Sequence, residues 1–387
     1  MKTGQVTTVA HNGYFGRYLA GYLTYLHQGV LFGVAFDPGT MAVRGTAVPL
    51  LDGVASDPLT AGGQLDVSQT GTVVYRSSKG AAHGYPVAWL DSTGNTQPLL
   101  PKPGAYQTLR VSPDGRRLAL AMDTGKGLDI YVYDMPRDAM SPLTFNGRGN
   151  NSPVWTPDGK HLVYASATDK TIWWIRADGA GDAQRLLESK TRLRPSAFSP
   201  DGRYLSYSEV YADQADCWIL PLDASDPEHP KPGTPEVFLK TPAGEAEGVF
   251  SPDGRWISYL SNESGRPEVY VRPFHGSAGG KWRISTTSGG NYSFWSRDGR
   301  GLYYQALDNR IMVVEYTTTG ESFAAGPPRV WSETPVRAAP QGFHALDLAP
   351  DGKRFAILPR DVMADERGSV RATFLLNFFD ELHRRLP

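Results

Sequence analysis

A short turn sequence, Ser-Pro-Asp-Gly, recurs along the 387-residue chain at nearly regular intervals. From a degenerate first copy ending at Gly71, successive glycines are separated by 44, 44, 43, 52, 45 and 53 residues. This spacing is the length of one four-stranded propeller blade rather than of a helical repeat, so the chain is expected to fold as a repeat array. The copies are Ser68-Gln69-Thr70-Gly71, Ser112-Pro113-Asp114-Gly115, Thr156-Pro157-Asp158-Gly159, Ser199-Pro200-Asp201-Gly202, Ser251-Pro252-Asp253-Gly254, Ser296-Arg297-Asp298-Gly299 and Ala349-Pro350-Asp351-Gly352.

Each copy is placed where a hairpin turn is needed, because Asp-Gly supplies the positive backbone dihedrals of a tight turn between antiparallel strands. Around the second copy, apolar runs at 109–111 and 118–121 flank the turn, and further runs follow at 130–133 and 143–145. Alternating, β-branched and aromatic residues in these runs favour strands. Each repeat therefore predicts a four-stranded antiparallel unit.

The repeats predict one all-β domain over residues 1–387, a single β-propeller. Six anchors from Ser68 to Gly299 give six units, and the segments 1–60 and 340–378 are expected to share the closing blade. Joining strands from the two ends removes the exposed edges of an open array, so seven four-stranded blades is the preferred count. Six would require one unit to fold differently, and eight would require each end to build its own blade. Residues 379–387 are expected to form a short helix or tail.

Composition narrows the classes of function. The 39 Lys and Arg residues nearly balance the 40 Asp and Glu residues, so overall charge gives no reason to expect a nucleic acid partner. Cys217 is the only cysteine, which excludes an internal disulfide and a cysteine-cluster zinc site. No apolar run is long enough to cross a bilayer, and residues 1–13 hold no hydrophobic segment of the signal-peptide type. We therefore expect a soluble monomer without membrane insertion.

The repeated Ser-Pro-Asp-Gly followed by strands such as Asp129-Ile130-Tyr131-Val132-Tyr133 resembles the TolB-like propeller repeat over nearly the whole chain. Segments 251–259, 263–274, 280–285 and 376–387 also resemble the propeller region that follows the catalytic domain in bacterial membrane-anchored serine/threonine kinases. This resemblance implies a sensing or interaction module, extracytoplasmic or periplasmic and part of a longer protein. The kinase motifs His-Arg-Asp, Asp-Phe-Gly and the glycine-rich loop are absent, so the chain is not expected to be a kinase.

Other local catalytic motifs are missing as well. The chain has no Gly-x-Ser-x-Gly elbow, no His-Glu-x-x-His zinc helix and no phosphate-binding Gly-x4-Gly-Lys-Ser/Thr loop. A site assembled from different blades stays open, because propellers bring polar groups from several strands to a central channel.

The residues that enter each innermost strand are expected to line the channel mouth on the face opposite the Asp-Gly turns. Each of these residues also has a purely structural interpretation. Asn151 and Asn291 could be turn residues, Arg194 could pair with a carboxylate of a neighbouring blade, and His344 could be packed in the protein interior. Glu245 and Glu247 alternate, so at most one of them should face the channel. The candidate ligand-binding residues are Tyr106, Asn151, Arg194, Asn291, Tyr292 and His344.

Two functions remain. The leading hypothesis is a non-catalytic propeller that binds a protein, a peptide or a small molecule at the channel mouth, with no cofactor. The alternative is a Ca²⁺-assisted hydrolase of lactones, esters or phosphotriesters, since calcium prefers hard oxygen ligands. There Glu247, Asn151 and Asn291 would hold the metal, with Glu247 acting in catalysis and His344 as general base.

Overall fold

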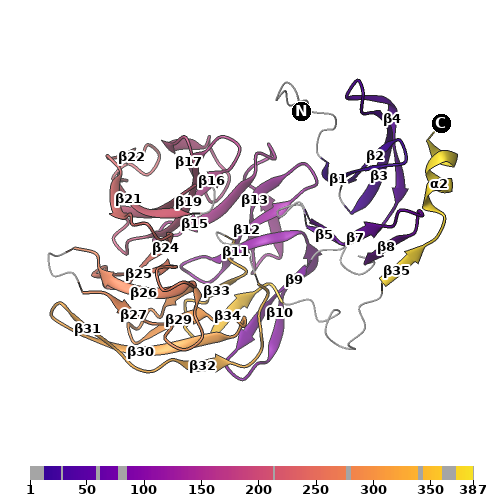
Figure 1. Ribbon diagram of the computed structural model, residues 1–387. Coiled ribbons are helices and arrows are strands. Elements are labelled where there is room, and N and C mark those ends of the chain that lie inside the picture. Colours follow the sequence, from indigo (N-terminus) through magenta and orange to yellow (C-terminus); the bar gives the residue numbers. More distant parts are fainter. Residues whose placement is uncertain are drawn as a thin grey trace. The chain divides into compact units, whose positions relative to one another are not determined.

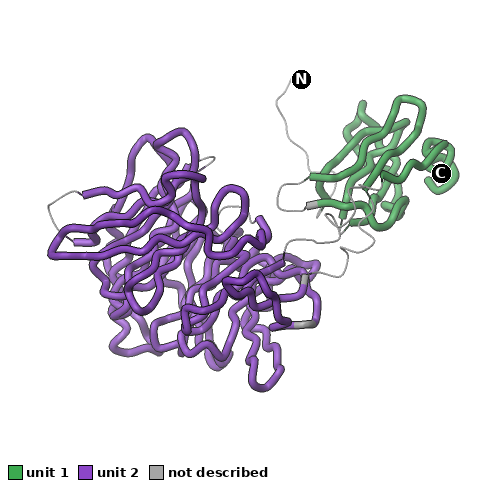
Figure 2. Tube along the Cα trace, turned by 90° about the horizontal axis from the view of Figure 1, so that it is seen from below, with its two compact units in different colours: residues 1–84, 361–387 green, residues 85–360 purple. Residues whose placement is uncertain are grey.

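The computed structural model describes residues 13–27, 29–57, 62–76, 85–211, 214–275, 280–338, 343–359 and 372–386. These residues form strands throughout, with one helix at the end of the described part (Figure 1). The chain divides into two compact units, unit 1 with residues 1–84 and 361–387 and unit 2 with residues 85–360 (Figure 2). The sequence predicted one domain over residues 1–387, whereas the contacts divide the chain into these two units. No helix within the described ranges has the length and apolarity of a membrane span.

Within its described residues, unit 1 contains three small sheets, one of which includes β35(Ala372–Leu375), and the helix α2(Phe378–Arg385). Its helix α2 follows strand β35 and buries Phe378, Leu382 and the adjoining Leu386 in an apolar cluster that includes Leu26 and Leu31. The Tyr22 hydroxyl donates a 2.8 Å hydrogen bond to the Leu386 carbonyl, which fixes the end of the helix on the sheet. The sheets are β1(Tyr14–Leu19), β2(Tyr22–His27), β3(Val30–Asp37) and β4(Ala42–Leu51); β35(Ala372–Leu375), β8(Val73–Arg76) and β7(Leu65–Val67); and β5(Ser56–Asp57) with β6(Gly62–Gly63), and α2 spans Phe378–Arg385.

Unit 2 contains six antiparallel sheets of four or five strands each. Five of them follow the sequence repeat, with neighbouring strands adjacent in the chain as the prediction required. These five are β11(Tyr106–Val111), β12(Arg117–Asp123), β13(Leu128–Asp134) and β14(Ala139–Pro142); β15(Asn150–Trp155), β16(His161–Ser166), β17(Thr171–Arg176) and β18(Gln184–Glu188); β19(Arg192–Phe198), β20(Tyr204–Val210) and β21(Ala215–Asp223) with β22(Lys231–Pro232) and β23(Glu236–Leu239); β24(Glu245–Phe250), β25(Trp256–Ser261), β26(Glu268–Pro273) and β27(Trp282–Arg283); and β28(Asn291–Trp295), β29(Gly301–Gln305) and β30(Ile311–Thr319) with β31(Ser322–Ala325) and β32(Arg329–Ser332).

The sixth sheet, here called the composite sheet, joins strands from the two ends of unit 2. It has the order β10(Thr96–Gly104), β9(Tyr85–Asp91), β34(Arg354–Ile357) and β33(Leu346–Leu348). Phe355 of β34 faces Leu90 of β9 in the antiparallel register. The sequence assigned closure to residues 1–60 and 340–378, and this assignment is wrong for residues 1–60, because strands β1 to β4 pair only with one another among the described residues. The hairpin around Asp351-Gly352 supplies the first two strands that β9 and β10 lack.

The Asp-Gly turns have the conformation that the sequence predicted. Gly202 has φ +73° and donates its N–H to the Ser199 carbonyl at 2.9 Å. Asp201 Oδ1 accepts from the Ser199 hydroxyl at 2.5 Å and from the Arg203 amide at 3.1 Å, so the aspartate stabilises its own turn. The equivalent glycines of the other complete copies in unit 2 also have φ between +67° and +71°. The repeated aspartates are therefore turn-formers.

Adjacent sheets of unit 2 pack face to face around a common centre (Figure 1). Their first strands are neighbours in the order β33, β11, β15, β19, β24 and β28. The sheet of β28 packs against the composite sheet through an apolar cluster that includes Phe294 of β28 and Phe355 of β34. This is the architecture of a β-propeller, in which the first strand of each blade lines the centre.

Candidate functional site

Five of the first strands, β11, β15, β19, β24 and β28, show a register shift against their second strand. Three of these shifts, after Asn151, after Ala246 and after Asn291, include a non-glycine residue of positive φ. At these shifts Ser152, Glu247 and Tyr292 have φ of +51°, +58° and +39°. A left-handed conformation is costly for residues other than glycine, and such strain gathers at functional sites because it redirects side chains. The bulges thus mark the centre of unit 2 as a candidate site.

Five ionisable side chains meet at this centre in a group here called the charged column. His344 Nε2 lies 2.9 Å from Glu247 Oε2, and both side chains are 4% exposed. Arg110 Nη2 lies 3.3 Å from His344 Nε2, and Arg110 Nη1 lies 3.4 Å from Asp347 Oδ1. Arg194, half-buried, is the fifth member, and its charge acts on Glu247. The column therefore combines two arginines, two carboxylates and a histidine, and it draws on β11, β19, β24, β33 and His344, two residues before β33.

Neighbouring groups hold the column in place. Arg110 Nη2 donates to the Ser196 carbonyl at 2.9 Å, and the Val111 amide donates to Asp347 Oδ2 at 2.7 Å. The Tyr292 ring packs on the His344 ring with centroids 4.5 Å apart. Two buried polar atoms, His344 Nδ1 and the Ser196 hydroxyl, find no hydrogen-bond partner within the described ranges. Unpaired buried polar atoms are unfavourable, and ordered water is their usual partner in folded proteins.

The protonation states follow from burial and from the neighbouring charges. Burial lowers the pKa of His344, and the nearby Arg110 cation lowers it further. Burial also disfavours the Glu247 carboxylate, but His344, Arg110 and Arg194 outweigh this effect and hold the pKa of Glu247 below its ordinary value. At neutral pH His344 is therefore an uncharged imidazole that donates Nε2–H to the Glu247 carboxylate.

Acid is expected to destabilise unit 2 through His344. Because its pKa in the folded protein is below the ordinary value of 6.5, the unfolded chain binds the extra proton first, and the free energy of unfolding should fall as pH decreases below about 6.5. One such histidine contributes up to about 1.4 kcal/mol per pH unit. All nine tryptophans lie between residues 85 and 360, so tryptophan fluorescence in urea follows unit 2 alone.

The matched variant is His344→Gln, which keeps a donor toward Glu247 and cannot titrate. We expect a smaller loss of unfolding free energy between pH 7 and pH 5.5 in this variant than in the wild type. His161, whose pKa burial also lowers, adds to the remaining slope, whereas Glu245 and Asp347, whose pKa values burial raises, oppose it. Equal slopes in the two proteins would show that His344 does not titrate as described.

A cavity of about 750 Å³ opens beside the column, on the face that carries the Asp-Gly turns. Each of the six first strands contributes to its wall. Its polar part includes Arg110 and Asp347 of the charged column, the further charged residues Asp114, Asp158 and Arg297, and the serines Ser196, Ser199 and Ser251. The remaining wall is mainly aromatic and proline-rich, and it includes Trp155, Phe198, Phe250, Trp295, Pro200 and Pro252. We call this the central cavity.

The sequence placed the channel mouth at the opposite ends of the first strands. Of its candidates, Glu247, His344, Tyr292 and Arg194 do come together, as described above. Asn151 instead donates to the Gly149 carbonyl and accepts from Ser152, the turn role that was the ordinary alternative. The Tyr106 hydroxyl donates to the Lys102 carbonyl at 3.1 Å, and Asn291 is paired with Gln305 across the strands. None of these three lines the central cavity.

Sequence reasoning missed Arg110, Asp347 and Ser196. The signal was present, because Thr108 and Arg110 alternate with Leu109 and Val111 on a first strand, and a charged residue there must face either the centre or solvent. Asp347 stands likewise between Leu346 and Leu348. Arg110, Ser196 and Asp347 lie farther along their strands, whereas the predicted site residues lie where each first strand begins.

The oxygen donors at the centre do not suit calcium. Glu247 is already bound by His344, and the guanidinium groups of Arg110 and Arg194 surround it with positive charge. A divalent cation favours several carboxylate and carbonyl oxygens without neighbouring cations. Among the described residues, no three His, Cys, Asp or Glu side chains are grouped as a metal site requires. The predicted ligand set of Glu247, Asn151 and Asn291 thus does not fit the ion.

Comparisons with known proteins agree with the architecture. No family model matches the chain. An uncharacterized protein of Agrobacterium fabrum is 25% identical over 214 residues, which cover 50% of this chain and 67% of that protein. YuxL of Bacillus subtilis, named an uncharacterized peptidase, is 25% identical over 42% of this chain and 23% of its own length. The Tol-Pal system protein TolB of Wolinella succinogenes is 23% identical over 38% of this chain and 34% of its own length. The chain thus spans only a minor part of the last two relatives.

A solved structure described as TolB from Agrobacterium tumefaciens is 17% identical to this chain, with a TM-score of 0.52, and the match covers 71% of this chain and 97% of that one. At this level of identity the likeness concerns the fold. The chain has the fold of the TolB-like β-propellers.

Proposed function

We propose that unit 2 is a six-bladed propeller, closed by the composite sheet, that binds an extended peptide segment of a partner protein in its central cavity without catalysis. The packing of the composite sheet against the sheets of β11 and β28 supports this closure. The proposed count of six differs from the seven expected from the sequence, because β1 to β4 are assigned to unit 1.

The central cavity is the observation that carries the proposal. Arg110 offers guanidinium donors and Asp347 offers carboxylate oxygens. A peptide group needs one donor and one acceptor, and this set supplies both. The aromatic and proline side chains of the wall suit the apolar side chains of a bound segment, and a volume of about 750 Å³ accommodates several residues of one.

A binding role also agrees with the electrostatics of the column. Its buried carboxylates are opposed by Arg110 and Arg194, so the column is nearly neutral and is held by its own contacts. His344 is buried and hydrogen-bonded to Glu247, which leaves it poorly placed as a general base for a substrate. The hydrolase alternative has no comparable support from the contacts of these residues.

The test uses a phage-displayed library of random 12-residue peptides selected on the full chain. The repeat itself shows which change the turns accept, because Arg297 occupies the position that proline holds in the neighbouring copies. Pro200→Arg combined with Pro252→Arg should place two long cations at the central cavity and weaken the selected peptides about tenfold or more.

Pro350→Arg is the matched control, since Pro350 has the same position in its turn and does not line the central cavity. We expect it to bind the peptides as the wild type does. Equal affinity of the double variant and the wild type, or failure to select any peptide that saturates, would contradict the proposed function.

A further inference from the structure

A second cavity, of about 710 Å³, lies on the same face between the sheets of β15 to β18 and β19 to β23. We call it the outer cavity. Its floor includes His161 and Trp174, whose rings stack with centroids 4.8 Å apart and an interplanar angle of 26°. Phe198 meets Trp174 edge to face at 6.2 Å. Three aromatic rings are thus prearranged around one opening.

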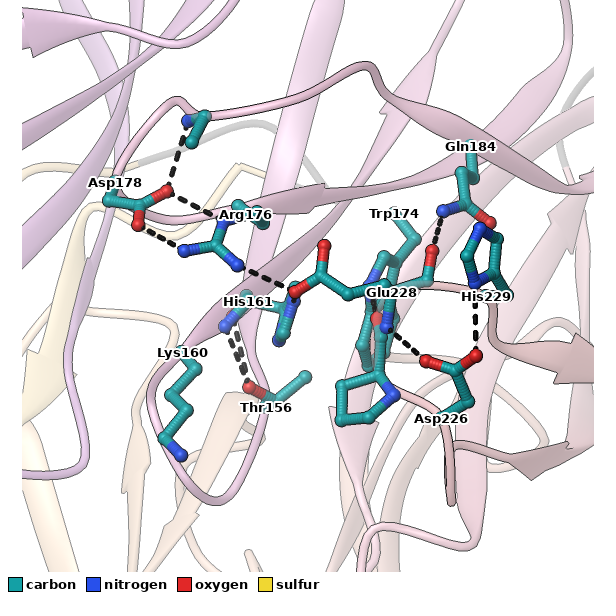
Figure 3. Close-up of polar contacts among 12 residues, drawn as sticks. Thr156, Lys160, His161, Trp174, Arg176, Asp178, Gln184, Asp226, Glu228 and His229 are labelled. Atoms are coloured by element: carbon teal, nitrogen blue, oxygen red, sulfur yellow. Dashed lines mark hydrogen bonds and ion pairs between the residues drawn. The ribbon is translucent and has the colours of Figure 1, made fainter.

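The segment 223–233, which precedes β23, forms one side of this cavity and is fastened to the sheet of β17 (Figure 3). Trp174 Nε1 donates to the Pro227 carbonyl at 3.0 Å. Figure 3 shows Arg176 between Asp178 and Glu228, with Nη1 at 2.6 Å from Glu228 Oε1, and Gln184 donates to the Glu228 carbonyl. Because backbone and side-chain contacts both hold this segment, the cavity is preformed.

The charges around the outer cavity do not select an ion. Asp158, Asp201 and Asp223 stand against Arg203 and Lys231. Asp158 accepts a hydrogen bond from the Thr156 hydroxyl and Asp201 accepts one from the Ser199 hydroxyl, so one oxygen of each carboxylate is already engaged within its own turn. His161 adds no charge at neutral pH, since its ring is buried. Aromatic rings, in contrast, gain edge-to-face and stacking contacts beyond simple burial.

The outer cavity adjoins the central cavity. Pro157, Asp158 and Phe198 line both of them. Phe198 ends β19, so the two openings meet across this ring and the neighbouring turn of Pro157. A segment that lies in the central cavity can therefore place a side chain in the outer cavity without a break in contact.

We infer that the outer cavity binds an aromatic side chain of the partner segment. The proposal rests on the proposed function for the identity of the occupant, whereas the aromatic site itself depends only on the outer cavity. Selected peptides should carry a Trp, Tyr or Phe at a fixed position, and replacing it with Ala should weaken binding about tenfold.

The direct test titrates the full chain with N-acetyltryptophanamide, observed by ligand-detected NMR. We expect saturable binding with a Kd of about 1 mM, and binding of N-acetylleucinamide weaker by about threefold or more. Ala224→Trp and Ser225→Trp each fill the outer cavity from the segment 223–233 and should weaken the tryptophan probe about tenfold. Two variants are used so that misfolding of one, judged by its melting temperature, leaves the other as the test.

Ala180→Trp is the matched control, because Ala180 is exposed on a neighbouring turn and does not line the outer cavity. It should bind the probe as the wild type does. Binding that does not saturate, or that both folded filling variants retain, overturns the inference whatever the peptide selection gives. Loss of probe binding in these variants supports the aromatic site even if Pro200→Arg with Pro252→Arg leaves peptide affinity unchanged. Failure of the aromatic site and failure of the proposed peptide-binding function are therefore distinguishable.

Discussion

Arg110→Met is expected to lower the free energy of unfolding of unit 2 by about 3–5 kcal/mol, because it leaves buried carboxylates without their cation. Asp347 is the first affected, since burial already raises its pKa and Arg110 opposes that shift. The Ser196 carbonyl also loses its donor. Methionine has a similar length and apolar character to the arginine stem, so the effect measures lost charge and hydrogen bonds more than a cavity. Urea unfolding followed by tryptophan fluorescence gives the value.

The paired variant separates charge from packing. Adding Asp347→Asn to Arg110→Met removes the uncompensated carboxylate and should recover a substantial part of the lost unfolding free energy. A single variant that loses less than about 1 kcal/mol would mean that Arg110 is solvated rather than engaged in the charged column.

Phe355→Ala should cost about 3–5 kcal/mol of unfolding free energy, since it removes a fully buried ring where the composite sheet meets the sheet of β28. Its ring contacts Trp331, Phe294 and Tyr303 edge to face, with centroids 5.0, 5.5 and 5.6 Å away. The same fluorescence measurement follows the effect.

Phe145→Ala is the control within unit 2, because Phe145 is 78% exposed, and it should change the unfolding free energy by less than about 0.5 kcal/mol. If both variants were equally stable, the last hairpin of unit 2 would not pack where the composite sheet places it.

Local features of the fold could be predicted from the sequence because they depend on neighbouring residues. Asp201-Gly202 dictates its own turn, and the flanking runs pair through that turn. The strand β9 pairs instead with β34, more than 250 positions away, and the sequence of β9 does not identify this partner. Ser68 to Gly71 looked like the anchor for β9 and β10, yet it lies between β7 and β8 of unit 1.

The candidate site was predicted in part for a related reason. Strict alternation allows only one of Glu245 and Glu247 to face the centre, but both are buried, because the bulge at Glu247 changes the direction of the strand. Glu245 accepts from Thr241 while Glu247 binds His344. Glycine is the residue that usually indicates a positive φ in a sequence. A bulge with positive φ at a glutamate therefore could not be predicted from the residue type.

The most direct test of the binding account is to locate a selected peptide on the full chain. A peptide carrying p-benzoylphenylalanine is cross-linked by light, and the modified residues are identified by mass spectrometry. The account predicts cross-links within residues 110–114, 154–158, 196–200, 249–252 and 295–297, all beside the central cavity. Cross-links confined to the opposite ends of the first strands, around Asn151, Arg194 and Asn291, would contradict it.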